Sequence, residues 1–285
     1  MASGKHKKCN IDSNIRVNYK GEIYSTEKYG DYVVTRELIG IGCSDRIFEV
    51  EFLNTGYKTF GTRSTITHGG LRDRSIPSVY GVGCIGNTYY ITDPNMQHYY
   101  KIWSGMIERC YNVGSHNYEK YGAIGVKVSD DWLTFTNFYW DIRKLYGFEN
   151  VKMEPNMYQL DKDYLQLNIP REQRIYSKET CMWISLYENN LLKGRDNNQT
   201  GYFGTRYDTG FYYTKIYNTY YGRFAKVEEA ACLFNYIYPI VSIKPYCTLP
   251  MINNVPMIPF EELMSRNLLK NRTALDEFLN NNQIL

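Results

Sequence analysis

The chain has 285 residues, of which 43% are hydrophobic and 22% charged, and this balance is typical of a folded protein with a buried core. Its formal net charge is only +3, with an isoelectric point near 8.3, which excludes a strongly basic nucleic-acid binder. Any contacts with phosphate must therefore come from a local cluster of cations. The 29 tyrosines supply many rings for stacking on bases or for protein interfaces.

The cysteines and the hydropathy pattern indicate a cytoplasmic protein without a membrane partner. The seven cysteines are odd in number and include no C-x-x-C pair, which argues against a disulfide framework and against a zinc knuckle. No apolar run approaches the roughly 20 residues of a membrane span. We therefore expect a reducing compartment, the host-cell cytoplasm if the chain is encoded by a phage.

The first 92 residues predict a flexible tail followed by a β-rich module. Residues 1–14 are polar and predict the tail. From residue 15 to residue 92, three short runs are rich in β-branched and aromatic residues, namely residues 32–35, 46–52 and 58–65. Asn54, Thr55 and Gly56 separate the last two runs and are typical of a hairpin turn. The pattern predicts a small sheet or barrel-like module.

Residues 93–193 have a mixed pattern of helix and strand. Apolar side chains at helical spacing from Tyr100 to Cys110 predict an amphipathic helix that ends near Asn112. A glycine turn into a short strand (121–128), a second helix (132–145) and strands near residues 158–167 and 181–185 complete this predicted core.

The last third of the chain predicts a sheet, a helix and a terminal tail. After a polar linker at residues 195–200, three aromatic strands are expected at residues 202–207, 211–217 and 220–224. The apolar face of residues 227–237 then predicts a helix, so residues 194–243 form a βββα module. Residues 244–285 predict a proline-broken linker and a terminal helix or helical pair, which must dock on its own chain or on a partner. The fold class is α+β.

Four sequence blocks carry a family resemblance. They are YKIWSGMIERCYN (residues 100–112), YEKYGAIGVKVSDDWLTFTNF (118–138), LDKD (160–163) and YSKETCMWISLYENN (176–190). In this order they resemble a large group of phage proteins described as HNH-endonuclease-like or homing-endonuclease-like. The resemblance covers roughly residues 75–190 and implies an HNH-like α/β core over residues 93–193, with DNA as the partner.

The resemblance also implies a catalytic site, which this sequence alters. Such a nuclease needs a histidine base and Asp, His or Asn ligands for one divalent cation, such as Mg²⁺. The matching strand reads Asp161-Lys162-Asp163, with lysine where the family has histidine, and lysine keeps its proton at neutral pH. Asp161, Asp163 and His98 are the catalytic candidates, and Asp161, Asp163 and Asn190 are the metal candidates. Alternatively, the Asp and Asn side chains are turn and cap residues.

The βββα module, with GRFAKVEEAACLFNYIY (residues 222–238), resembles the APETALA-two-type DNA-binding domain. That resemblance implies a sheet lying in the major groove, although the tryptophans of the family's strands are absent. The residues on the corresponding strands here are Arg206, Tyr212, Lys215, Tyr217 and Arg223. Strand alternation places Phe211, Tyr213, Lys215 and Tyr217 on one face and Tyr212, Thr214 and Ile216 on the other. The first set either contacts DNA or covers a helix or a subunit interface.

Three interpretations follow. The first is a phage DNA-binding protein of the HNH-like group with a degenerate catalytic site. The second is an active metal-dependent DNA endonuclease whose base is His98 or His116. The third is a protein-interaction factor, such as a phage inhibitor of a host defence nuclease complex or a virion-associated protein, and it is compatible with a homo-oligomer.

Overall fold

The structure is a computed structural model that describes residues 18–38, 46–88, 91–197, 199–242 and 249–282. The chain divides into two compact units, Met1–Thr92 and Asp93–Leu285. The predicted tail, residues 1–14, lies outside the described residues. The fold is mixed α and β, as predicted from the sequence. The second unit joins the predicted core, the βββα module and the terminal tail.

The first unit contains a four-stranded antiparallel sheet with the strand order β1-β2-β3-β4. Its strands are β1 (Ile23–Thr26), β2 (Gly30–Leu38), β3 (Ile47–Phe52) and β4 (Lys58–Thr62). The predicted hairpin turn joins β3 to β4, with Gly56 at a φ of 70°. The last predicted run was too long, because helix α1 (Arg63–Thr67) begins there and buries Ile66 against the sheet.

Helices α2 (Met96–Tyr111) and α3 (Phe135–Ile142) form the centre of the second unit's core. The predicted first helix is confirmed, with its end at Asn112. The second is shorter than predicted because Asp130–Leu133 forms a separate 3₁₀ turn. The buried Trp103 indole N–H donates to the Trp132 carbonyl at 2.7 Å, which ties this turn to α2.

Two small sheets complete the core. Strand β5 (Lys127–Val128) pairs in parallel with β7 (Ile175–Tyr176), and β6 (Tyr158–Asp161) pairs antiparallel with β8 (Met182–Ser185). Strand β6 ends at Asp161 because a turn begins there, so the strand expected to reach residue 167 was too long.

The sequence pattern missed two helices, α4 (Phe148–Met153) and α5 (Leu186–Asn197). Helix α5 begins at a buried cap, where the Glu188 N–H donates to the Ser185 hydroxyl and the Glu188 carboxylate accepts from the Ser185 N–H. It extends into the residues that were expected to begin the polar linker.

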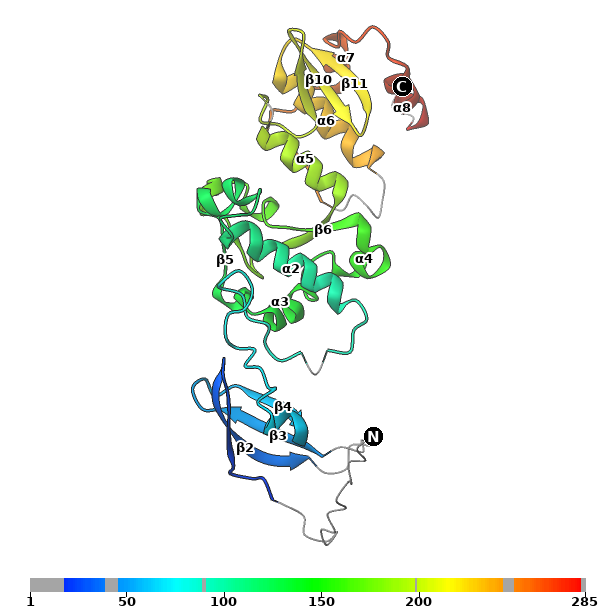
Figure 1. Cartoon of the computed structure of the whole chain (residues 1–285). Coiled ribbons are helices and arrows are strands. Elements are labelled where there is room, and N and C mark those ends of the chain that lie inside the picture. Colours follow the sequence, from blue (N-terminus) through cyan, green and yellow to red (C-terminus); the bar gives the residue numbers. More distant parts are fainter. Residues whose placement is uncertain (1–17, 39–45, 89–90, 198, 243–248, 283–285) are drawn as a thin grey trace, which may run out of the picture. The chain divides into compact units, whose positions relative to one another are not determined.

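The predicted order of three strands and a helix is confirmed. Strands β9 (Thr205–Asp208), β10 (Phe211–Ile216) and β11 (Thr219–Phe224) form an antiparallel sheet with β10 in the centre, followed by α6 (Val227–Val241). Helix α6 packs against one face of this sheet (Figure 1). The Thr214 hydroxyl on that face donates to the Ala230 carbonyl of α6 at 2.8 Å.

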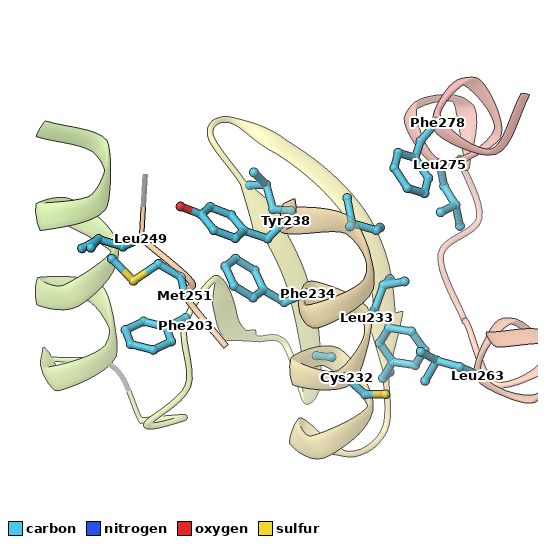
Figure 2. Close-up of a cluster of buried hydrophobic side chains, with 14 of the residues drawn as sticks. Phe203, Cys232, Leu233, Phe234, Tyr238, Leu249, Met251, Leu263, Leu275 and Phe278 are labelled. Carbon is cyan, nitrogen blue, oxygen red and sulfur yellow. The ribbon is translucent and has the colours of Figure 1, made fainter. Parts of the chain in front are cut away.

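The terminal helices α7 (Phe260–Ser265) and α8 (Thr273–Asn281) dock on their own chain. Leu263 of α7, together with Leu275 and Phe278 of α8, lies in the hydrophobic cluster around α6 (Figure 2). Met182 and Ile184 of β8 belong to the same cluster, so the core and the βββα module share one apolar interior. None of the helices in the described part of the chain has the length and hydrophobicity of a membrane span.

Asn253 holds the segment before α7 in place. The Phe203 N–H donates to the Asn253 side-chain oxygen at 2.6 Å, and the Asn253 amide donates to the carbonyls of Phe203 and Ala231. The Asn253 N–H donates to Asn235 of α6. This buried amide therefore replaces the backbone partners that an irregular segment lacks.

We expect Asn253→Ala to lower the free energy of unfolding by roughly 2–3 kcal/mol, because it leaves buried backbone groups without partners. Chemical denaturation followed by tryptophan fluorescence measures the change. Asn254→Ala removes the same side chain at the exposed neighbouring position and should change stability little. Equal effects of the two substitutions would contradict this role of Asn253.

Candidate nucleic-acid interface and the adjoining cleft

The strand register places two of the predicted binding residues, Arg206 and Arg223, on a common face of the sheet with Tyr213 between them. Tyr213 of β10 lies opposite Arg206 of β9 on one side and opposite Arg223 of β11 on the other. Directly paired residues point to the same face. Because Thr214 and Ile216 are buried toward α6, alternation directs the row of Arg206, Tyr213 and Arg223 outward.

Aromatic rings hold the cations of this outer face. The Arg223 guanidinium lies 3.7 Å from the centroid of the Phe211 ring. The Lys215 ammonium lies 5.4 Å from the Tyr220 ring, and Arg206 donates to the Tyr220 hydroxyl at 3.3 Å. We call the set Arg206, Phe211, Tyr213, Lys215, Tyr220 and Arg223 the basic aromatic face.

No carboxylate among the described residues forms an ion pair with Arg206, Lys215 or Arg223. The Nε atom of Arg223 is buried and has no hydrogen-bond partner in the described structure. Within the described residues, the positive charge of the basic aromatic face is therefore not neutralised by a carboxylate.

Two of the predicted binding residues lie elsewhere. Tyr212 is on the opposite face, where it packs against the hydrophobic cluster and contacts the Tyr207 ring at 5.1 Å. Tyr217 is in the turn after β10, at a φ of 53°, and its ring stacks on Tyr187 of α5 with centroids 4.0 Å apart. Tyr217 thus borders the face without forming part of it.

A cavity of about 570 Å³ lies beside the basic aromatic face and is lined in part by Arg206, Lys215, Tyr217 and Asn190. Asn190 thus lies with the predicted binding residues and not with Asp161. Sequence alternation did not place Tyr220, because a β-bulge between Thr214 and Lys215 pairs Tyr220 with Lys215.

A separate cleft of about 450 Å³ gathers the catalytic candidates of the core. Helix α2 contributes His98, Lys101 and Arg109, the turn after β6 contributes Asp161, Lys162 and Asp163, and α5 contributes Asn189 and Lys193. The α2 residues lie on a common face because their spacing follows the helical repeat. The second histidine candidate, His116, is exposed and does not line this cleft.

Asp161 acts as a turn residue. One of its carboxylate oxygens accepts the backbone N–H groups of Asp163 at 2.8 Å and of Tyr164 at 2.7 Å. No hydrogen bond joins it to His98 in the described structure. Burial raises the pKa of the Asp161 carboxyl to about 6.

Lys162 lines the cleft and is surrounded by aromatic rings and charged side chains. Its ammonium forms an ion pair with Asp163 and lies 5.3 Å from the ring centroids of both Tyr121 and Tyr176. The Arg109 guanidinium lies 5.4 and 5.2 Å from the same two rings. Two cations therefore share two aromatic partners.

Asp163 is held by two cations. Its carboxylate accepts from Lys162 and, at 2.9 Å, from Arg174. Burial opposes its ionisation, but the charges and hydrogen bonds of Lys162 and Arg174 outweigh burial and lower the pKa of Asp163.

These residues do not fit the divalent cation that the family resemblance implies. Asp161 is engaged by backbone N–H groups, Asp163 is engaged by two cations that would repel a metal ion, and Asn190 lines the other cavity. Within the described ranges, no cluster of three or more His, Cys, Asp or Glu side chains is placed to hold a metal.

Comparisons with protein-family models, with curated proteins and with solved structures give no match to this chain.

The raised pKa of Asp161 predicts a pH-dependent stability. The folded protein binds this proton more tightly than the unfolded chain, so the stabilisation is complete below about pH 4 and is lost as the pH rises through about 6. A pKa raised from about 4 to about 6 corresponds to roughly 3 kcal/mol of unfolding free energy. Asp161→Asn keeps an oxygen for the two N–H groups but removes the titration.

We therefore expect the difference in unfolding free energy between Asp161→Asn and the wild type to increase in favour of the variant from pH 4 to pH 7. Denaturant titrations at each pH measure it. Asp161→Ala, which also loses the hydrogen bonds, should be destabilised at every pH. Parallel pH profiles for the wild type and Asp161→Asn would contradict the shifted pKa.

Proposed function

We propose that the chain is a DNA-binding protein of the HNH-endonuclease-like group, and that the basic aromatic face is its DNA contact. The observation that carries the proposal is the set of three cations, Arg206, Lys215 and Arg223, which lie among rings on one face and have no carboxylate partner in the part of the chain that the structure describes. Such cations neutralise phosphates, and the rings offer apolar surfaces to bases or sugars.

The dimensions of the sheet support a duplex as the ligand. Three strands about 4.8 Å apart present a surface about 10 Å wide. The major groove of B-form DNA is about 12 Å wide and admits β-structure. Helix α6 covers the inner face, so the outer face of β9, β10 and β11 is the one offered to the groove.

The proposal does not include hydrolysis. A general base must accept a proton, whereas Lys162 is paired with Asp163 as an ammonium ion. Both carboxylates of the cleft are engaged by backbone N–H groups or by cations. A protein-interaction role is less favoured. It was suggested in part by the apolar side of the terminal helices, and that side is buried on the chain itself.

The double variant Arg206→Ala/Lys215→Ala should bind duplex DNA more weakly and with a weaker salt dependence. Each lost phosphate contact reduces the slope of log K against log salt concentration by about 0.9, so the expected reduction is about 1.8. Fluorescence anisotropy with a labelled duplex at several salt concentrations measures the slope.

The matched control is Arg171→Ala/Lys144→Ala, which removes the same charge from exposed positions of the core. The proposal fails if the wild type does not bind DNA at low salt, or if the control and the test variant lose affinity equally.

A further inference from the structure

The cleft between α2, the turn after β6 and α5 carries an excess of positive charge. Four cations line it, namely Lys101, Arg109, Lys162 and Lys193, against two carboxylates, Asp161 and Asp163. Arg174 adds a fifth cation behind Asp163. The neighbouring Tyr176 does not offset the excess, because burial raises its pKa well above the usual value and keeps the phenol neutral.

The excess extends into the protein interior. The Lys162 side chain is only 2% exposed, and a buried charge is costly unless it is compensated. Lys162 shares Asp163 with Arg174 and shares the rings of Tyr121 and Tyr176 with Arg109, so its charge is only partly compensated. An anion in the cleft would supply the missing negative charge.

We propose that this cleft binds a phosphate group of the nucleic-acid backbone, and that Lys162 and Arg109 provide the charge in place of a divalent cation. The inference rests on the proposed function, because it assigns the cleft as a second contact for the same DNA. The volume of about 450 Å³ is sufficient for one backbone phosphate with its sugar.

Helix α5 connects the cleft to the basic aromatic face. Asn189 and Lys193 are four residues apart and line the cleft, whereas Asn190 and Leu191 line the cavity that contains Arg206 and Lys215. A helix is about 10 Å wide, so a strand that rises about 3.4 Å per nucleotide crosses it in about three steps.

Asp161→Asn separates a phosphate cleft from a metal site, because the two predict opposite signs. Removing a negative charge near a bound phosphate should raise the affinity for DNA about threefold, whereas removing a ligand of a metal that holds the phosphate should lower it. Anisotropy titrations with a labelled duplex, in EDTA and in Mg²⁺, measure both. In EDTA, we expect Asp161→Asn to bind the duplex more tightly than the wild type does.

The cations supply the second arm of the test. Lys162→Met, and separately Lys101→Ala/Lys193→Ala, should weaken binding and reduce the salt slope by about 0.9 for the lost phosphate. In Lys162→Met, Asp163 still has Arg174 as an ion-pair partner. Lys101 and Lys193 are exposed, so their replacement should not unfold the protein. The double variant therefore reports on the cleft even if Lys162→Met unfolds. Lys144→Ala is the control for the single charge lost in Lys162→Met, and Arg171→Ala/Lys144→Ala is the control for the two charges lost in the double variant.

The outcomes distinguish the two proposals. If each cleft variant binds like its control of equal charge while Arg206→Ala/Lys215→Ala loses affinity, the cleft assignment is wrong and the DNA-binding face stands. Weaker binding by Asp161→Asn, together with a requirement for Mg²⁺, also overturns the cleft assignment and restores a metal site. A wild type that does not bind DNA overturns the proposed function itself and the cleft assignment with it.

Discussion

The burial of α6 is the constraint on which the second unit depends. Ala230, Leu233 and Phe234 are fully buried between the three-stranded sheet and the segments that follow the helix, as Figure 2 shows for the labelled side chains. Because α6 occupies one face of the sheet, Thr214 and Ile216 must point toward it. The side chains at alternate positions must then point outward, and these are the cations and rings of the basic aromatic face.

The basic aromatic face and the cleft have the same arrangement of cations packed against aromatic rings. In both, cations that lack enough carboxylate partners lie against aromatic rings, Arg223 on Phe211 in the face and Lys162 on Tyr121 in the cleft. A ring reduces the cost of a poorly solvated cation without neutralising its charge. Each surface therefore keeps a local positive charge, although the chain as a whole carries a formal charge of only +3.

Buried polar side chains tie the segment before α7 to α5 and to the βββα module. The Glu188 carboxylate caps the start of α5 and also accepts the Leu249 N–H at 2.7 Å, and Asn253 joins α6 to the loop before β9. The Glu188 contact fixes this segment to α5, and the Asn253 contacts fix it to α6 and to the loop before β9, within the second unit. A buried group with all its partners favours a single arrangement of the elements around it.

The sequence by itself determined α2, the three aromatic strands and α6. Hydrophobic periodicity is a property of each short segment, and in these elements the tertiary packing agrees with it. The sequence also placed Arg206, Lys215 and Arg223 on those strands. Only the tertiary structure decided that Tyr212 faces α6, that a bulge brings Tyr220 to Lys215, and that Lys101, Lys162 and Lys193 meet in one cleft. Those outcomes depend on packing between segments far apart in the chain, which no local pattern encodes.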